Sequence, residues 1–356
     1  MFPGADIFTH VYVPERISEE IRSHRVHTTF VQKLPGARRH HQWFLPVMPI
    51  ALEQVDLRDY DLVISSESGP AKGVIVRPDA IHLCYCHSPM RYIWDLYQEH
   101  LRYLRGPGRM AMRLIAHYMR MWDAESARRV SAFVANSRFV AQRVRAYYQR
   151  EAQVVHPPVD IGAFSPSEPK DDEYLVVSQL VPYKRIDLAI AAFNRSGRKL
   201  TVIGEGALLD DLRALARPNV RLVGWQPFEV IREQYARCRA LIFPGLEDFG
   251  IVPVEAMASG KPVIAYRGGG ALETVVEGRT GVFFDEQSPD SLNRAIGDFE
   301  RKSPQFSAAA IAEHARRFDR SAFVRGINAI VERITKAPRT ERYLEDSDGE
   351  RRWSVA

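Results

Sequence analysis

Two glutamates with a glycine between them are the clearest candidates for chemistry in this chain. Glu247 and Glu255 stand eight residues apart, and short apolar runs at 240–243 and 262–266 flank them. We therefore expect a strand, a loop carrying Glu247, a helix carrying Glu255 and a second strand. Gly250 would open the helix, where unpaired N–H groups attract an anion, and the carboxylates can accept hydrogen bonds from sugar hydroxyls. The pattern predicts a site for a phosphate and a sugar; a loop with two solvated acids is the alternative.

This segment resembles the Glu-x7-Glu motif of retaining glycosyltransferases of family 4, which have the GT-B fold. The resemblance implies a nucleotide-sugar donor, with Glu255 on the ribose hydroxyls and Glu247 acting at the hexose as a catalytic residue. The backbone of Phe249, Gly250 and Ile251 would face the hexose and the phosphate. The resemblance requires no metal and no other cofactor.

A histidine that directly follows another apolar run is the second candidate. Residues 86–95 resemble the His-Ser/Thr-Pro-x-Arg-Tyr-x-Trp-Asp signature of bacterial mannosyltransferases of surface-polysaccharide synthesis. A histidine at the C-terminal end of a strand can stabilise charge near the anomeric carbon of the donor, although a lone histidine is more often structural. The signature predicts His87 as catalytic, Arg91 as a residue that lines the cleft, and GDP-mannose as the donor. Asn136 and Ser137 resemble a further cleft-lining position, and capping of the next helix is the alternative.

The loop at 178–185 is the third candidate, because family members use an arginine and a lysine there to hold the nucleotide diphosphate. Lys184 matches the lysine and would act as a point charge. Gln179 stands where the family has arginine and cannot neutralise charge, so either Arg185 substitutes or the enzyme is weak. Gly204 follows the next predicted strand and would let the backbone approach the nucleotide, with a plain turn as the alternative.

Apolar runs alternate with helical patterns along the whole chain, less regularly in the first half. The expected strands lie at 5–8, 61–65, 81–85, 132–135, 174–178, 200–203, 220–223, 240–243, 262–266 and 281–284. Such alternation predicts parallel, doubly wound sheets that bind ligands at the C-terminal ends of their strands. We therefore expect an α/β protein of the GT-B type, with two Rossmann-like domains facing across a cleft. The first would lack the leading strand and glycine loop that family members carry before the equivalent of Phe2.

Three segments are expected. Residues 1–168 would form the acceptor-side domain, residues 169–335 the nucleotide-sugar-binding domain, and residues 336–356 a charged tail. The polar stretch at 165–172 would link the domains. By resemblance, the last helix should cross back to the first domain.

Length and composition fit a two-domain globular protein of 356 residues, with 46% apolar and 26% charged residues. Three cysteines argue against a disulfide framework and for a reducing compartment. The sequence shows no spanning segment and no signal peptide, so we expect a cytoplasmic protein. Asp59 and Asp61 have the D-x-D spacing of metal-dependent transferases, but they precede a predicted strand, and we interpret them as turn residues without a metal.

Residues 91–150 contain twelve arginines and four acidic residues. Within 101–122 the arginines alternate with leucine, methionine, isoleucine and tyrosine, a composition suited to a membrane surface. An ordinary amphipathic helix with a solvated basic face is the alternative. Nucleic acid is not expected, because no stacking or groove-reading motif accompanies the charge. The expected partners are a peripheral contact with an anionic membrane, at its inner face, and a lipid-linked acceptor.

The expected activity is retaining transfer of a hexose, namely mannose from GDP-mannose, to a saccharide or polyprenyl-diphosphate-linked acceptor. A truncated, non-catalytic family relative that acts as a partner subunit is the alternative, because Gln179 replaces an arginine and the glycine loop is missing. An epimerase or phosphorylase on the same two-domain plan is a third interpretation, since fold alone does not set chemistry.

Overall fold

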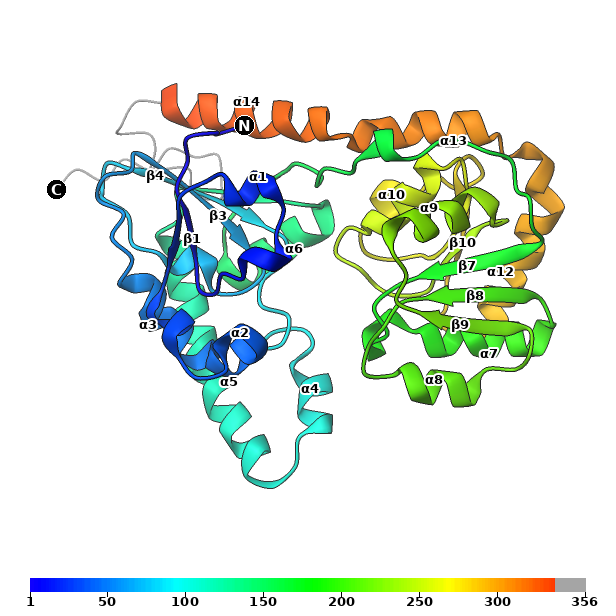
Figure 1. Cartoon of the computed structure of the whole chain (residues 1–356), viewed down its shortest axis with the longest axis horizontal. Helices are drawn as coiled ribbons and strands as arrows, with labels where there is room; N and C mark the ends of the chain where they lie inside the picture. The colour runs from blue at the N-terminus through cyan, green and yellow to red at the C-terminus, as the bar shows by residue number, and fades with distance from the viewer. Residues whose placement is uncertain (337–356) are drawn as a thin grey trace. The chain divides into compact units, whose positions relative to one another are not determined.

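A computed structural model describes residues 1–336 and divides the chain into two units, each with parallel sheets covered by helices (Figure 1). Of the described residues, unit 1 contains Met1–Asn136, Val140–Val154 and residues 327–336, and unit 2 contains Ser137–Phe139 and Val155–Gly326. The expected α/β architecture is confirmed. Beyond Lys336, the charged tail predicted at 336–356 lies outside the described residues.

Unit 2 is built on a six-stranded parallel sheet. In spatial order its strands are β12 (Gly281–Phe284), β11 (Val263–Tyr266), β10 (Leu241–Phe243), β7 (Glu173–Val177), β8 (Lys199–Ile203) and β9 (Val220–Gly224). Its helices are α7 (Ile186–Ser196), α8 (Leu209–Leu215), α9 (Phe228–Arg237), α10 (Ile251–Ala258), α11 (Ala271–Thr274), α12 (Pro289–Lys302), α13 (Ala308–Ala315) and the first turns of α14 (Arg320–Lys336). The strand order therefore reverses between β7 and β10.

Both faces of this sheet are buried, which explains why its strands are continuous apolar runs in the sequence. Successive side chains of a strand point to opposite faces. Tyr174 and Val176 of β7 pack in the core under α7, α8 and α12, whereas Leu175 packs in the core under α9, α10 and α13 (Figure 1). A parallel sheet covered on both sides favours nearly continuous apolar runs in its strands.

The chain passes from unit 1 to unit 2 between Val154 and Val155, earlier in the sequence than the expected boundary at 168. Two contacts explain the difference. Val159 forms a parallel bridge with Asp319, and Phe164 packs in the core between the sheet and α9. The stretch after Val154 is therefore an integral part of unit 2.

Unit 1 contains a four-stranded parallel sheet and a separate parallel strand pair. The sheet follows chain order with β3 (Leu62–Glu67), β4 (Ile81–Cys86), β5 (Ala132–Ala135) and β6 (Ala152–Val154), and the pair is β1 (Ile7–Thr9) with β2 (Val26–Thr28). Its helices are α1 (Glu19–Arg22), α2 (Ala37–His40), α3 (Met48–Glu53), α4 (Tyr97–Tyr103), α5 (Gly106–Arg128) and α6 (Arg138–Tyr148). Strands β2 and β6 were not predicted, because His27 and Gln153 interrupt the apolar run in these three-residue strands.

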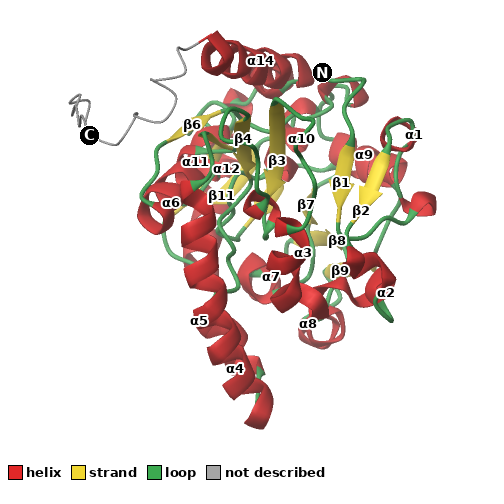
Figure 2. Cartoon of the chain, turned by 90° about the vertical axis from the view of Figure 1, so that its left-hand side faces the viewer, coloured by secondary structure: helices red, strands yellow, loops and turns green. Residues whose placement is uncertain are grey.

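Helix α5 is the longest helix of unit 1. Together with α4 it forms a helical pair that extends beyond the strands of this unit (Figure 2). The C-terminal half of α5 packs on the unit, where Asp123, Ser126 and Ala127 are buried.

Candidate functional site

The loops after β7 and β10 lie side by side in unit 2, because these two strands are neighbours and the strand order reverses between them. In open α/β sheets, ligands bind at such a switch point, outside the carboxyl ends of the strands. The two loops touch backbone to backbone: a Cβ added to Gly245 would lie 3.0 Å from the Cα of Lys184. Two of the predicted candidate segments therefore meet here.

Lys184 and Glu247 form an ion pair across these two loops. Both side chains are largely shielded from solvent, with exposed fractions of 15% and 17%. The structure thus brings together the lysine predicted for the diphosphate and the glutamate predicted for the hexose. Each group compensates the charge of the other.

The loop at 178–185 contains two other residues predicted to bind the diphosphate, Arg185 and Gln179. Both have partners other than the Lys184–Glu247 ion pair. Arg185 has a left-handed backbone (φ 54°) and precedes α7, and its guanidinium contacts Asp187 at 3.2 and 3.4 Å. Gln179 is exposed, and its carbonyl accepts a hydrogen bond from the Ser178 hydroxyl (3.0 Å). Here the guanidinium of Arg185 is held by Asp187, so Lys184 is the cation of this loop that lies at the switch point.

Gly250 and Phe249 set the turn that begins α10. Gly250 has φ 90°, a left-handed conformation that favours glycine, and Ile251 is the first residue of the helix. The Phe249 ring is buried between His156 and Phe318, with ring centroids 5.3 and 5.6 Å away. This packing holds the loop between Glu247 and α10, whose first N–H groups lack helical partners.

Two glycines after β11, Gly269 and Gly270, pack closely against the loop that carries Glu247 and Phe249. A Cβ added at Gly269 would lie 2.2 Å from the Glu247 carbonyl oxygen, and one at Gly270 would lie 2.3 Å from the Cα of Phe249. The Gly270 N–H also donates to the Glu247 carbonyl (2.9 Å). Gly204 likewise has φ 141°, and its added Cβ would lie 1.8 Å from the Ser178 carbonyl oxygen. Side chains at these positions would collide with the loops of the switch point.

Glu255 lies on α10 and accepts a hydrogen bond from the Tyr235 hydroxyl of α9 (2.9 Å). Tyr235 is fully buried. Burial raises the pKa of Glu255, and the hydrogen bond from Tyr235 opposes that rise. Sequence reasoning missed Tyr235, because a single tyrosine in an amphipathic helix carries no functional signature.

In unit 1, His87 follows β4 and is held by the ends of the neighbouring strands. Its Nε2 lies 2.9 Å from the Ser66 hydroxyl of β3, and its carbonyl accepts a hydrogen bond from the Asn136 side chain (2.9 Å). The His87 N–H donates to the Glu67 carbonyl (2.7 Å). Asn136 thus braces the backbone of His87, while Ser137 is buried and groups with unit 2. Ser66 was not predicted.

Arg91 lies in a network inside its own motif. Its guanidinium contacts Asp95 at 3.2 Å, and Asp95 also accepts a hydrogen bond from Arg143 (2.8 Å). Arg143 donates in turn to the Ser88 hydroxyl (3.2 Å). The arginine and aspartate of the signature therefore fix the shape of the segment after His87.

Three fully buried charged residues, Glu67, Lys72 and Asp123, form a cluster that contacts this segment through Trp94. Lys72 forms ion pairs with Glu67 and Asp123, and Asp123 also accepts a hydrogen bond from Trp94 Nε1 (2.7 Å). Burial raises the pKa of Glu67 to about 7, against the opposing effect of Lys72. Sequence reasoning missed this cluster, since Asp123 lies fifty-one residues from Lys72 along the chain.

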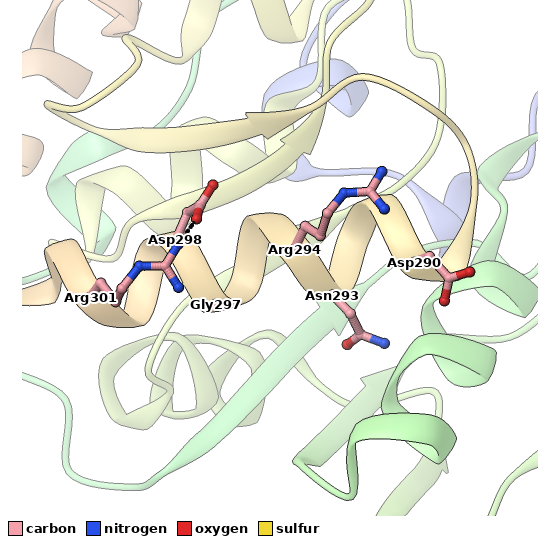
Figure 3. A pocket seen from close by; sticks show the side chains of 6 residues that line it. All are labelled: Asp290, Asn293, Arg294, Gly297, Asp298 and Arg301. Carbon is pink, nitrogen blue, oxygen red and sulfur yellow. Dashed lines mark hydrogen bonds and ion pairs between the residues drawn. The ribbon is translucent and has the colours of Figure 1, made fainter.

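Neither a metal cluster nor a spanning helix is found in the part of the chain that the structure describes. Asp61, part of the D-x-D spacing, precedes β3 and pairs with Arg77 at 2.5 Å. A surface depression lies along α12 and is lined by Asp290, Asn293, Arg294, Gly297, Asp298 and Arg301 (Figure 3). None of the predicted site residues lines it.

Two sequence families match the chain in succession. Residues 3–162 match the family described as Glycosyltransferase Family 4, and residues 161–322 match Glycosyl transferases group 1. One relative is the GDP-mannose-dependent alpha-(1-6)-phosphatidylinositol monomannoside mannosyltransferase of Mycolicibacterium smegmatis. It is 29% identical over 208 residues, which cover 49% of this chain and 54% of the relative. The match thus spans about half the length of that protein.

Solved structures show the same fold. Sucrose-phosphate synthase from Thermosynechococcus elongatus has a TM-score of 0.72 and 17% identity, covering 94% of this chain and 89% of its own. Anabaena HepE in complex with UDP has a TM-score of 0.61 and 18% identity, covering 88% of both chains. The fold is that of the GT-B glycosyltransferases. Within this class, the chain belongs to glycosyltransferase family 4, with matched regions that extend from residue 3 to residue 322.

Proposed function

We propose that the protein is a retaining hexosyltransferase that moves mannose from GDP-mannose to a saccharide or polyprenyl-diphosphate-linked acceptor. The observation that carries the proposal is the meeting of Lys184 and Glu247 at the switch point of unit 2. A lysine, a helix start and a carboxylate at one place provide complementary groups for a diphosphate and a sugar.

The proposed roles follow from the groups present. Lys184 and the first N–H groups of α10 stabilise the departing diphosphate, because its negative charge grows as the bond to the anomeric carbon breaks. Glu255 accepts hydrogen bonds from the ribose, and Glu247 binds the hexose once Lys184 has turned to the phosphate. His87 supports the positive charge at the anomeric carbon. The acceptor oxygen forms the new bond, and its proton passes to an oxygen of the leaving diphosphate.

GDP-mannose is proposed as the donor on two grounds. The segment around His87 resembles the signature of bacterial mannosyltransferases. The Mycolicibacterium relative is named as dependent on GDP-mannose, whereas the HepE structure contains UDP. Both the sugar and the base therefore need a direct test.

We also propose that the protein works in the cytoplasm, as a peripheral protein at the inner face of an anionic membrane. Its support is the basic and apolar segment at 101–122 together with the proposed lipid-linked acceptor. No metal or other cofactor enters the proposed reaction.

The test is a transfer assay with radiolabelled GDP-mannose and polyprenyl-diphosphate-linked saccharides. We expect a labelled lipid product. Nuclear magnetic resonance should show that the transferred sugar keeps the anomeric configuration that it has in the donor. Glu255→Ala should lower kcat/KM for the donor, and Glu277→Ala, an exposed acid of the same unit that pairs with Arg267, should not. Product of inverted configuration, or transfer from UDP-glucose but not from GDP-mannose, would contradict the proposal as stated.

A further inference from the structure

Helix α5 carries a row of large apolar side chains in contact with solvent. Met110, Leu114, Tyr118 and Met121 follow one another at spacings of four, four and three residues, so they lie on one side of the helix. Their exposed fractions are 58%, 68%, 39% and 56%. Single exposed apolar residues are ordinary, but a continuous row of this kind marks a contact surface. We call these four residues the apolar row.

The opposite side of the same helix already supplies the core of unit 1. Ala116 and Met119 are fully buried against Met90 and Ile93, and Met112 and Ile115 pack around them. The apolar residues that the sequence places in this segment are thus divided between two faces. Folding of the unit accounts for the inner face and leaves the apolar row without a structural role.

Two arginines run along one edge of the apolar row. Arg109 and Arg113 are exposed, and each directly precedes a member of the row. Neither has an ion-pair partner among the residues that the structure describes. Arg109 lies in the first turn of α5, where a cation is unfavourable beside the positive end of the helix dipole.

Two other arginines of α5 have partners within the described part of the protein, unlike Arg109 and Arg113. Arg120 donates to the Ile93 carbonyl (2.6 Å) and lies 4.3 Å from the centroid of the Tyr97 ring. Arg128 pairs with Glu125 at 3.1 Å. The uncompensated charge is therefore confined to the N-terminal half of α5, beside the apolar row.

We propose that this face of α5 binds the surface of an anionic phospholipid bilayer. The apolar row enters the boundary between headgroups and acyl chains, while Arg109 and Arg113 contact lipid phosphates. Charge complementarity favours a lipid surface: an apolar protein partner would leave both arginines uncompensated, and a nucleic acid would leave the apolar row in water. The extension of α4 and α5 beyond the strands of unit 1 gives a flat surface access to the helix (Figure 2). This proposal specifies which residues make the membrane contact proposed above. It rests on the proposed function only in taking the acceptor to be lipid-linked.

Vesicle sedimentation tests the arginines. Vesicles of phosphatidylglycerol and phosphatidylcholine in equal parts should bind the full chain, and vesicles of phosphatidylcholine alone should bind it weakly. The double variant Arg109→Gln/Arg113→Gln should bind the anionic vesicles about 25-fold less tightly, because each cation at such a surface contributes about fivefold. The control Arg294→Gln/Arg301→Gln removes the same charge from the exposed face of α12 in unit 2 and should leave binding within about twofold (Figure 3).

Leucine substitutions test the apolar row. Leu114→Gln should weaken binding to anionic vesicles about tenfold, because part of a leucine side chain no longer leaves water on binding. Leu215→Gln changes a leucine that is 44% exposed at the end of α8 and should have no effect. All these positions are exposed, so the melting temperatures should stay close to that of the unchanged protein.

Two results would overturn the inference. One is equal vesicle binding by the unchanged chain, the double arginine variant and Leu114→Gln. The other is a concentration-dependent dimer in sedimentation velocity that Leu114→Gln dissolves, which would assign the apolar row to a second copy of the chain. Nucleotide binding by the same preparations, followed by calorimetry, reports on the donor site separately, so the two proposals fail by different measurements.

Discussion

The Lys184 ammonium and the Glu247 carboxylate form an ion pair that joins the loops after β7 and β10. A diphosphate and a hexose at this switch point would compete for these two groups. Binding of the phosphate would draw Lys184 away and leave the carboxylate of Glu247 available to sugar hydroxyls. The ion pair therefore couples the two halves of the proposed donor site.

Glu247→Gln should tighten the binding of GDP about fivefold while it abolishes most hexose transfer. The substitution releases Lys184 from an ion pair that is worth about 1 kcal/mol when partly shielded. Titration calorimetry with GDP measures the first effect and the transfer assay the second. Glu277→Gln breaks the exposed pair with Arg267 and serves as the control. Weaker GDP binding by Glu247→Gln would show that Lys184 is not held back by Glu247.

Tyr235→Phe should weaken GDP binding about fivefold, because Glu255 loses the hydrogen bond that orients its carboxylate. The loss should vanish with 2′,3′-dideoxy-GDP, which offers no ribose hydroxyls. Tyr174→Phe removes an equivalent bond to Glu300, also 2.9 Å long, on the other face of the sheet. Both variants should lose similar stability, and only Tyr235→Phe should lose affinity. An equal loss for both nucleotides would contradict the proposed ribose contact.

Ser66→Ala should lower kcat about fivefold and leave KM for the donor nearly unchanged, since the serine hydroxyl orients the His87 ring. The neighbouring Ser65 lies 2.9 Å from His82 in the same geometry, but His82 is fully buried. Ser65→Ala should therefore cost stability without changing kcat. If both serine variants had the same kcat, Ser66 would have no role in positioning His87.

Lys72→Met should destabilise unit 1 by about 3–5 kcal/mol, because Glu67 and Asp123 would remain buried without a counter-charge. Arg58→Met removes an exposed ion pair with Asp56 and should change stability by less than about 0.5 kcal/mol. Urea unfolding measures both. A loss below about 1 kcal/mol for Lys72→Met would mean that this cluster is not a closed charge network.

Glu67 should also give the stability of unit 1 a distinct pH dependence. Its pKa is raised to about 7 in the folded chain from an ordinary value of 4.5, so the folded state binds more protons between these pH values. Its contribution to the free energy of unfolding therefore falls as pH rises from about 4.5 to 7 and stays constant above. Unfolding of Glu67→Gln across this range should lack that fall. An unchanged profile would assign the pH dependence to other groups.

Much of unit 2 could be predicted because its signals are local. The spacing of Glu247 and Glu255 predicted a loop and a helix, and the structure has both, with α10 beginning at Ile251. The contact of Lys184 with Glu247 could not be predicted from the residues alone, since it depends on β7 lying beside β10. Strand order is set by packing between distant segments, so the residues of β7 and β10 do not show that these strands are neighbours.

The missed residues share one physical property: each has its partner far away in the sequence. Tyr235 bonds a carboxylate twenty residues away, Ser66 bonds a histidine after the next strand, and Lys72 bonds Asp123 fifty-one residues away. A serine in a strand or a lysine in a turn has a plain structural interpretation until its neighbours are known. Burial then changes that interpretation, because a fully buried charge must be paired.

Unit 2 is proposed to bind a nucleotide-sugar where Lys184 pairs with Glu247, at the switch point of its sheet. The most direct test is thermal stabilisation of the purified chain across GDP, UDP, ADP and their mannose or glucose conjugates, because a ligand that binds only the folded state raises its melting temperature. We predict a rise of about 5–10 °C with GDP and GDP-mannose at a hundredfold excess over Kd, lost in Glu255→Ala. The absence of any shift with every nucleotide tested would contradict the claim.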